Sequence, residues 1–250
     1  TLNPSSAASD VYKRQARPID KLRQVSVTRD FVKCAEGSCL IEVGRTRVLC
    51  NASISGDIPA WLKNSGKGWV TAEYSLLPRS TNTRVKRERK SVSGRTQEIQ
   101  RLIGRSLRAA VNLEVLDGFS ITVDCDVLEA DGGTRTASIV GGFLALASAL
   151  KSWKKEHNIT AKVLDHFVTA TSVGILKGVP ILDLCYIEDS SAEVDMNVVM
   201  TEKGDFIEIQ GTGEESTYTR QEFNALLDLA EKGCNELLTI QKDYLDGELP

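Results

Sequence analysis

The sequence of 250 residues predicts an α+β fold in which a unit of several strands followed by a helix occurs twice. Segments with an apolar residue at every second position, typical of half-buried strands, occur in both halves. Each half then ends in a long segment whose apolar residues recur at helical spacing. Because the stretch 151–162 between them is polar and charged, we expect an N-terminal half over residues 16–150 and a C-terminal half over 151–250.

The N-terminal half begins with strand-forming segments. Cys39–Val43 and Val48–Ile54 flank Gly44–Arg47, which has the composition of a hairpin connection. A further strand is expected over Trp69–Leu77, and Pro78 would end it. These segments predict an antiparallel beginning to the fold.

The segment 79–108 concentrates positive charge. It holds ten Lys and Arg residues against Glu88 and Glu98, a local balance of +8 in a chain of net charge −3. Residues 79–94 lack a sustained apolar period and are predicted to form an exposed loop, whereas a helix is expected from Arg95. A basic segment on an acidic body is typical of proteins that bind a polyanion. On the helix itself, a solvated face is the expectation for three further arginines: Arg101, Arg105 and Arg108.

A glycine turn separates the strand expected over Phe119–Leu128 from a helix of about five turns. The turn is Asp131-Gly-Gly-Thr-Arg135. A helix start leaves free backbone N–H groups that bind anions, and the guanidinium of Arg135 is suited to phosphate. Arg95 also lies at a helix start and is a second candidate ligand of the same anion. The alternative is a tight turn whose arginine is only solvated.

The C-terminal half repeats this organisation. Two pairs of strands are expected, over Phe167–Leu176 and Ile181–Tyr186, and over Met196–Thr201 and Phe206–Gly211. Thr219-Arg-Gln-Glu222 is a capping box that begins a long amphipathic helix.

Five carboxylates and no basic residue lie between two of these strands: Asp183, Glu188, Asp189, Glu193 and Asp195. Such a cluster repels itself unless something positive occupies it. Hard divalent cations prefer oxygen ligands, and a carboxylate can protonate a departing hydroxyl group. The cluster is therefore a candidate metal and acid–base site, and the alternative is an acidic surface loop.

The remaining features exclude several classes of protein. No apolar run approaches the roughly 18 residues needed to cross a bilayer, so no membrane association is expected. Residues 1–15 are small and polar, unlike a secretory signal, and are expected to be a disordered or non-native leader. The six cysteines form no C-x-x-C pair, which predicts buried, reduced thiols in a cytoplasmic protein rather than a zinc site.

In five stretches the chain resembles the ribonuclease PH family, the phosphate-dependent 3′-to-5′ exoribonucleases of bacteria. The stretches are Arg17–Arg23, Gly68–Thr81, Gly94–Arg105, Asp131–Ser138 and Glu188–Thr201. The resemblance extends from about Arg17 to the last helix, and motifs this long in this order are specific. It implies duplicated β-α units resembling a ribosomal protein S5 domain, with mixed sheets covered by helices.

The resemblance also implies roles for individual residues. Inorganic phosphate, the co-substrate, would be bound by Arg95, Gly133, Thr134, Arg135 and Ser138. Asp189 and Asp195 would bind Mg²⁺ or Mn²⁺ and donate a proton, with Asp189 as the expected donor. The acceptor stem of a transfer RNA would be held by Arg79, Arg84 and Arg87.

The function expected from the resemblance is phosphorolytic trimming of the 3′ ends of transfer RNA precursors and other RNAs. Each terminal nucleotide is transferred to phosphate and leaves as a nucleoside diphosphate, so the enzyme is a nucleotidyltransferase. We expect a homohexamer built as a trimer of dimers, located in the cytoplasm. Three alternatives stay open: a catalytically silent RNA-binding subunit of an exosome-like ring, a hydrolytic nuclease, and an RNA-binding module without chemistry.

The chain departs from the family pattern at three places. The loop between Arg87 and Arg95 is about two residues shorter than the family's, which bears on RNA affinity. The residue after Gly44 is Arg45, where the family usually has asparagine, and residues 1–15 have no family counterpart; neither of these differences touches the expected chemistry.

Overall fold

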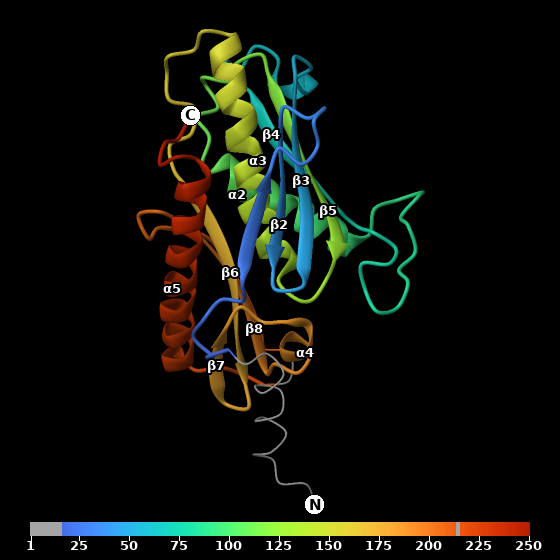
Figure 1. The fold of residues 1–250 in the computed structure, drawn as a ribbon, viewed down its shortest axis with the longest axis vertical. Coiled ribbons are helices and arrows are strands. Elements are labelled where there is room, and N and C mark those ends of the chain that lie inside the picture. Colours follow the sequence, from blue (N-terminus) through green and yellow to red (C-terminus); the bar gives the residue numbers. More distant parts are fainter. Residues whose placement is uncertain (1–16, 214–215) are drawn as a thin grey trace, which may run out of the picture.

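The computed structural model describes residues 17–213 and 216–250, so the predicted leader over residues 1–15 lies outside the described residues. Two β-sheets and their helices are arranged around one long central helix (Figure 1). None of the described helices is long and apolar enough to cross a membrane.

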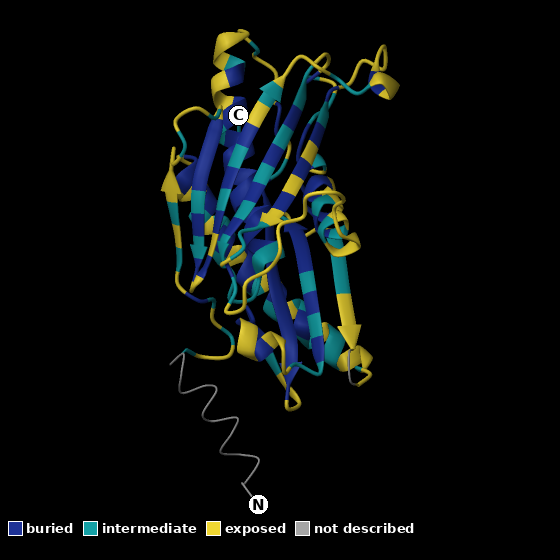
Figure 2. Cartoon of the chain, turned by 90° about the vertical axis from the view of Figure 1, so that its right-hand side faces the viewer, coloured by how far each residue is buried: buried dark blue, intermediate teal, exposed yellow. Residues whose placement is uncertain are grey.

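The first sheet contains the strands of the N-terminal half. Their spatial order is β1 (Val25–Arg29), β2 (Gly37–Val43), β3 (Thr46–Ser55), β5 (Ser120–Glu129) and β4 (Trp69–Leu76). Neighbouring strands are antiparallel except β4, which runs parallel to β5, so the sheet is mixed as expected. Buried and more exposed residues alternate along β3 and β5, as half-buried strands require (Figure 2).

Two helices pack on the first sheet, and the glycine turn precedes one of them. Helix α2 (Gly94–Arg108) packs on β4, and a short 3-10 helix, η1 (Ala60–Leu62), lies in the connection before β4. Helix α3 (Thr134–Glu156) packs on β2, β3 and β5. It is longer than predicted and continues past residue 151, where we expected the boundary between the halves.

The second sheet belongs to the C-terminal half and is antiparallel throughout. Its order is β7 (Val179–Leu182), β6 (Val168–Leu176), β8 (Val194–Thr201) and β9 (Phe206–Gly213). Helix α5 (Arg220–Tyr244) packs on β6 and β7. The predicted capping box is present, because the Thr219 side chain accepts from the Glu222 N–H and the Glu222 carboxylate accepts from the Thr219 N–H.

The strand predicted over Ile181–Tyr186 is present only at Ile181 and Leu182, the last two residues of β7, and the prediction is wrong beyond them. The chain leaves the sheet at Asp183, whose φ of +56° breaks the extended conformation. It then forms the one-turn helix α4 (Tyr186–Asp189), where the Glu188 side chain accepts from the Cys185 N–H at 2.9 Å. This turn brings Asp189 out of the sheet.

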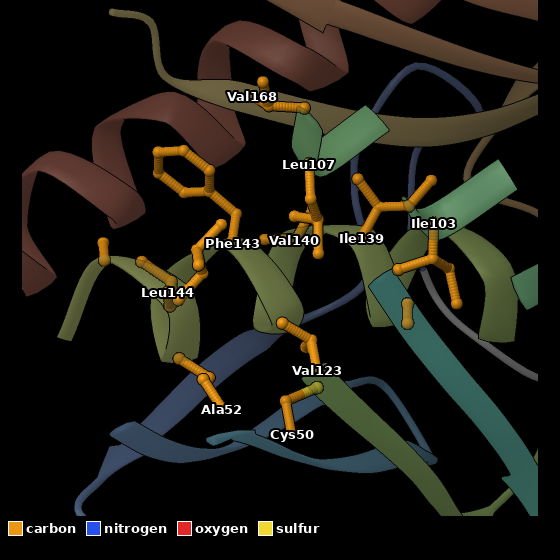
Figure 3. Close-up of a cluster of buried hydrophobic side chains, with 14 of the residues drawn as sticks. Cys50, Ala52, Ile103, Leu107, Val123, Ile139, Val140, Phe143, Leu144 and Val168 are labelled. Atoms are coloured by element: carbon orange, nitrogen blue, oxygen red, sulfur yellow. The ribbon is translucent and has the colours of Figure 1, made fainter. Parts of the chain in front are cut away.

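Helix α3 is the centre of the hydrophobic core. Phe143 and Ile139 lie among side chains from the first sheet, from α2 and from β6, including Val123, Leu107 and Val168 (Figure 3). Apolar residues at helical spacing predicted one buried face on this helix, whereas the structure buries nearly every residue from Thr136 to Leu150. Both halves contribute to this core, and two further clusters of buried apolar residues lie in the C-terminal half.

The cysteine prediction is confirmed for most of the positions. All six thiols are free, and five are buried: Cys39, Cys50, Cys125, Cys185 and Cys234. The prediction of burial is wrong for Cys34, which is exposed because it lies in the connection between β1 and β2 rather than in a strand.

Candidate active site

A cleft lies where the glycine turn meets α4 and β8, and its wall comes from both halves. The residues that line both of its adjoining parts are Arg95, Arg135, Asp189, Asp195 and Asn197. The inner part is also lined by Gly132, Gly133, Thr134 and Tyr74. The fold thus brings the start of α2, the start of α3, the end of α4 and strand β8 to one place.

The glycine turn requires glycine for both conformation and space. Gly132 and Gly133 have φ values of +78° and +66°, the left-handed region that favours glycine. A Cβ atom on Gly132 would lie only 2.4 Å from the carbonyl oxygen of Leu184. Gly133 is the N-cap of α3 and supplies no side chain to bind the first N–H groups of the helix. These N–H groups are suited to an anion.

The polar side chains beside this turn form two hydrogen-bonded pairs. The Tyr74 hydroxyl donates to the Thr134 hydroxyl at 2.9 Å, and Arg135 Nη2 donates to Glu98 Oε2 at 3.0 Å. Burial raises the pKa of Tyr74, although its bond to Thr134 and the charges of Arg95 and Arg135 act in the opposite direction. Tyr74 is therefore a neutral hydrogen-bond donor that orients Thr134.

The five carboxylates do not form the single cluster that the sequence suggested. Asp183 Oδ1 pairs with Arg23 at 2.7 Å, and Glu188 Oε2 pairs with Arg17 at 3.0 Å. Glu193 accepts from the Gly178 N–H at 3.3 Å. Of the five carboxylates, Asp189 and Asp195 are the two that line the cleft.

This pair has the chemistry of a site for a hard divalent cation. In the part of the chain that the structure describes, no group of three or more His, Cys, Asp or Glu residues could hold a metal ion. Mg²⁺ typically needs only one or two protein carboxylates, because water and substrate phosphate oxygens complete its shell. Two carboxylates without histidine or cysteine fit Mg²⁺ or Mn²⁺ rather than zinc.

Ser138 is one predicted site residue that the structure does not bring to the cleft. It lies one turn beyond Thr134 in α3, is fully buried, and lines neither part of the cleft. Its Oγ has no hydrogen-bond partner among the described residues. A role of Ser138 in phosphate binding therefore stays a prediction.

The three arginines predicted to hold RNA lie outside the cleft. Arg79, Arg84 and Arg87 are exposed in the connection between β4 and α2, which projects from the body of the molecule (Figure 1). The expectation of a solvated face on α2 holds for Arg101. It holds in part for Arg105, which is exposed but pairs with Glu208 at 2.6 Å. It is wrong for Arg108, which is partly buried and has its guanidinium 4.4 Å from the centre of the Trp69 ring. Both arginines join α2 to neighbouring strands.

Several residues that shape the cleft had no role assigned from the sequence. Tyr74 is one, and its place on the buried face of the predicted strand was the available signal. Arg17 and Arg23 are two more; they lie in a stretch that carried the family resemblance, but nothing local indicated their partners. The carboxylates with which they pair are 160 and 171 residues away in the sequence.

Comparisons with known proteins agree with this architecture. Residues 21–151 match domain 1 of the 3′ exoribonuclease family, and residues 166–233 match domain 2. Ribonuclease PH of Bacillus subtilis is 54% identical over 241 residues, which cover 95% of this chain and 98% of the relative. Ribonuclease PH of Corynebacterium kroppenstedtii is 52% identical, with 97% and 96% covered.

Solved structures share the fold at low sequence identity. The RNA-bound exosome of Archaeoglobus fulgidus superimposes with a TM-score of 0.77 at 19% identity, covering 94% of this chain and 96% of that one. Rice (Oryza sativa) Rrp46 gives a TM-score of 0.75 at 18% identity, covering 93% and 99%. The architecture is therefore the RNase PH-like α+β fold.

The fold and the cleft place the chain in this class of duplicated α+β proteins. Within the class, the chain belongs to the 3′ exoribonuclease family. The family resemblance found in the sequence motifs is thereby confirmed. The expected enzyme class is confirmed as well: a phosphorolytic exoribonuclease that acts as a nucleotidyltransferase.

Proposed function

We propose that this enzyme shortens the 3′ ends of transfer RNA precursors by phosphorolysis, with free phosphate bound between Arg95, Arg135 and the glycine turn. The observation that carries the proposal is the cleft itself. It places two arginines and the Thr134 helix start together with Asp189 and Asp195, although these residues come from different halves of the chain.

The chemistry follows from the charges in the cleft. A phosphate oxygen attacks the last phosphodiester in line, a new P–O–P bond forms, and the bond to the preceding 3′ oxygen breaks. Arg95 and Arg135 hold the phosphate against its own repulsion from the RNA phosphate. The products are a nucleoside diphosphate and an RNA shorter by one nucleotide, and the exchange of one phosphate ester for another makes the step reversible.

Asp189 and Asp195 serve the leaving group in this scheme. We assign Asp189 as the residue that protonates the departing 3′ oxygen, because it ends α4 on the wall of the cleft. Asp195, fixed in β8, would share with Asp189 the binding of Mg²⁺ or Mn²⁺. When bound, this cation offsets negative charge on the transferred phosphoryl group.

Substrate binding extends beyond the cleft. The exposed arginines Arg79, Arg84 and Arg87 would grip the phosphate backbone of a transfer RNA without reading its sequence. A homohexamer would place several such loops around bound RNA, and a cytoplasmic location fits the reduced thiols. These proposals are supported by the identity of 54% to a ribonuclease PH.

The phosphate site is tested by Arg135→Ala. We expect phosphate-dependent release of nucleoside diphosphate to fall by about 100-fold or more, as when one oxyanion-binding group is removed. Arg47→Ala is the matched control, because Arg47 pairs with Glu42 on the first sheet away from the cleft. Undiminished release by Arg135→Ala would refute the assignment.

Product analysis separates phosphorolysis from the alternatives. A hydrolytic nuclease would release nucleoside monophosphates and ignore added phosphate, whereas a silent ring subunit would release nothing. The exosome structures are only 18–19% identical to this chain, and the ribonuclease PH relatives are 52–54% identical, which favours an active enzyme.

A further inference from the structure

The segment that precedes β1 carries two arginines from the N-terminal half into the C-terminal half. Arg23 is 5% exposed, and the Arg17 side chain is 12% exposed. Arg23 binds the glycine turn, which carries the proposed phosphate site, and Arg17 binds the chain around α4, which carries Asp189. Because the two arginines bind different segments, each is expected to position a different part of the cleft.

Arg23 is bound to the glycine turn. Its Nη1 donates to the carbonyl oxygen of Asp131 at 2.6 Å, and its Nη2 donates to that of Gly132 at 3.3 Å. A Cβ atom on Gly133 would lie 3.0 Å from the same Nη2. Asp183 holds the guanidinium in place, accepting from Nε at 2.9 Å and from Nη2 at 2.7 Å. Arg23 therefore fixes the peptide groups that lead into α3.

Thr46 supports the same turn from the first sheet. Its hydroxyl donates to the Gly132 carbonyl at 2.7 Å and accepts from the Asp131 N–H at 2.9 Å. Both of these bonds are to the glycine turn, so Thr46 supports the phosphate side of the cleft. Replacing Thr46 would therefore loosen the turn independently of Arg23.

Arg17 is bound instead to the structure that carries Asp189. It donates to the carbonyl oxygens of Leu182 at 2.8 Å and Asp183 at 2.6 Å, and to Glu188 Oε2 at 3.0 Å. The same Glu188 oxygen accepts from the Cys185 N–H at the start of α4. Arg17 thus fixes both the entry to α4 and the residue that directly precedes Asp189.

We propose that Arg23 and Arg17 are positioning residues with divided tasks: Arg23 sets the phosphate-binding turn and Arg17 sets the carboxylate of Asp189. The proposal rests on the function proposed above. A buried ion pair contributes little stability compared with apolar residues of the same size, because both charges lose their hydration. Each guanidinium here also binds main-chain carbonyl oxygens, so each orients a backbone segment as well as neutralising a carboxylate.

Steady-state kinetics with a short single-stranded RNA and varied phosphate tests the division. Lysine keeps the charge, but its compact ammonium group lacks the planar fork of donors with which the guanidinium reaches Asp183 and the turn carbonyls together. Arg23→Lys should therefore raise the KM for phosphate by about 10- to 100-fold, the usual effect of losing a group that orients a ligand-binding residue. Its kcat should stay within about threefold of the wild type. Arg17→Lys should show the reverse, a kcat lowered by about 10- to 100-fold and a phosphate KM within about threefold.

Two further variants serve as a control and as a second, independent measurement. Arg47→Lys is the control, since Arg47 pairs with Glu42 at the surface, and it should change neither constant. Thr46→Val should raise the phosphate KM without lowering kcat even if Arg23→Lys fails to fold. Equal effects of Arg23→Lys and Arg17→Lys on both constants, or an unchanged phosphate KM in Thr46→Val, would overturn the proposal. If the wild-type enzyme itself released no nucleoside diphosphate, the proposed function would fail instead.

Discussion

The hydroxyl group of Tyr74 in β4 donates a hydrogen bond of 2.9 Å to the hydroxyl group of Thr134, the first residue of α3. Tyr74 is buried and neutral, so the bond fixes the direction in which the Thr134 oxygen faces the cleft. One strand of the first sheet thereby sets a side chain at the proposed phosphate site.

Tyr74→Phe removes this bond and keeps the ring. A hydrogen bond contributes roughly 0.5–1.5 kcal/mol, so we expect the phosphate KM to rise by about 2- to 12-fold with little change in stability. Phosphate-dependent initial rates measure the effect. Tyr244→Phe is the control, because its hydroxyl approaches Ser148 at 3.4 Å, away from the cleft. If the two variants had the same KM for phosphate, Tyr74 would have no role in the proposed phosphate site.

The buried pair of Arg23 and Asp183 predicts loss of stability in acid. Burial alone would raise the pKa of Asp183, but Arg23 outweighs it and lowers the pKa below the usual value of 3.8. The stabilisation is therefore fully present above the unfolded-state pKa of about 3.9 and is lost as the pH falls through the lower folded value. Urea unfolding at pH values down to about 2.5 should show this decline, and Asp183→Asn should show less of it.

At neutral pH the same variant should be unstable. Asp183→Asn leaves a buried guanidinium without its anion, which we expect to lower the free energy of unfolding by roughly 3–5 kcal/mol. Glu42→Gln, which removes a surface partner of Arg47, should lower it by at most about 1 kcal/mol. Similar losses in the two variants would contradict the role assigned to burial.

Alanine substitutions at Gly132 and Gly66 distinguish the cost of backbone strain from the cost of close packing. Both have left-handed φ values, +78° and +70°, but a Cβ atom has open space at Gly66 and would meet the Leu184 carbonyl oxygen at 2.4 Å at Gly132. Gly66→Ala should therefore destabilise the protein by only about 1–2 kcal/mol. Gly132→Ala should be clearly worse and should also abolish activity, as thermal unfolding and phosphorolysis assays would measure. Equal losses would show that the turn does not need its contact with α4.

The exposed arginines predict a salt-dependent effect on RNA binding. Arg84→Ala should weaken transfer RNA binding and reduce the slope of log affinity against log salt by about 1, the contribution of one phosphate contact. Phosphorolysis of a short single strand should be unchanged, because Arg84 lies outside the cleft. Arg101→Ala, on the solvated face of α2, is the matched control. An unaltered salt slope in Arg84→Ala would exclude this arginine from the RNA contact.

Local signals were sufficient to predict much of the fold. The hairpin around Gly44, the strand that ends at Glu129 and the capping box at Thr219 follow from alternation, glycine and side-chain capping, all of which act within a few residues. Strand β1 was not predicted, because its five residues, Val25–Arg29, are only partly buried at the sheet edge. Val25 and Val27 do alternate with polar residues, but two apolar positions are too few for the alternation to stand out.

The site was less predictable where it depends on distant partners. Sequence spacing alone gave five carboxylates equal standing, and the structure divides them according to which ones Arg17 and Arg23 reach. The strand predicted to continue to Tyr186 ends at Leu182. The next residue, Asp183, has a left-handed conformation and pairs with Arg23 of the N-terminal half. Tertiary contacts across the two halves override local propensity there.

The shared core around α3 also bears on how the chain is made. A nascent N-terminal half can pack α3 on the first sheet, but the side of the helix that meets Val168 stays exposed until β6 has left the ribosome. Apolar surface that is exposed on such a partly synthesised chain favours aggregation or chaperone binding. Because α3 begins at the glycine turn, completion of its burial also completes the support of the phosphate site. A released fragment that ends near residue 151 would therefore be prone to aggregation as well as inactive.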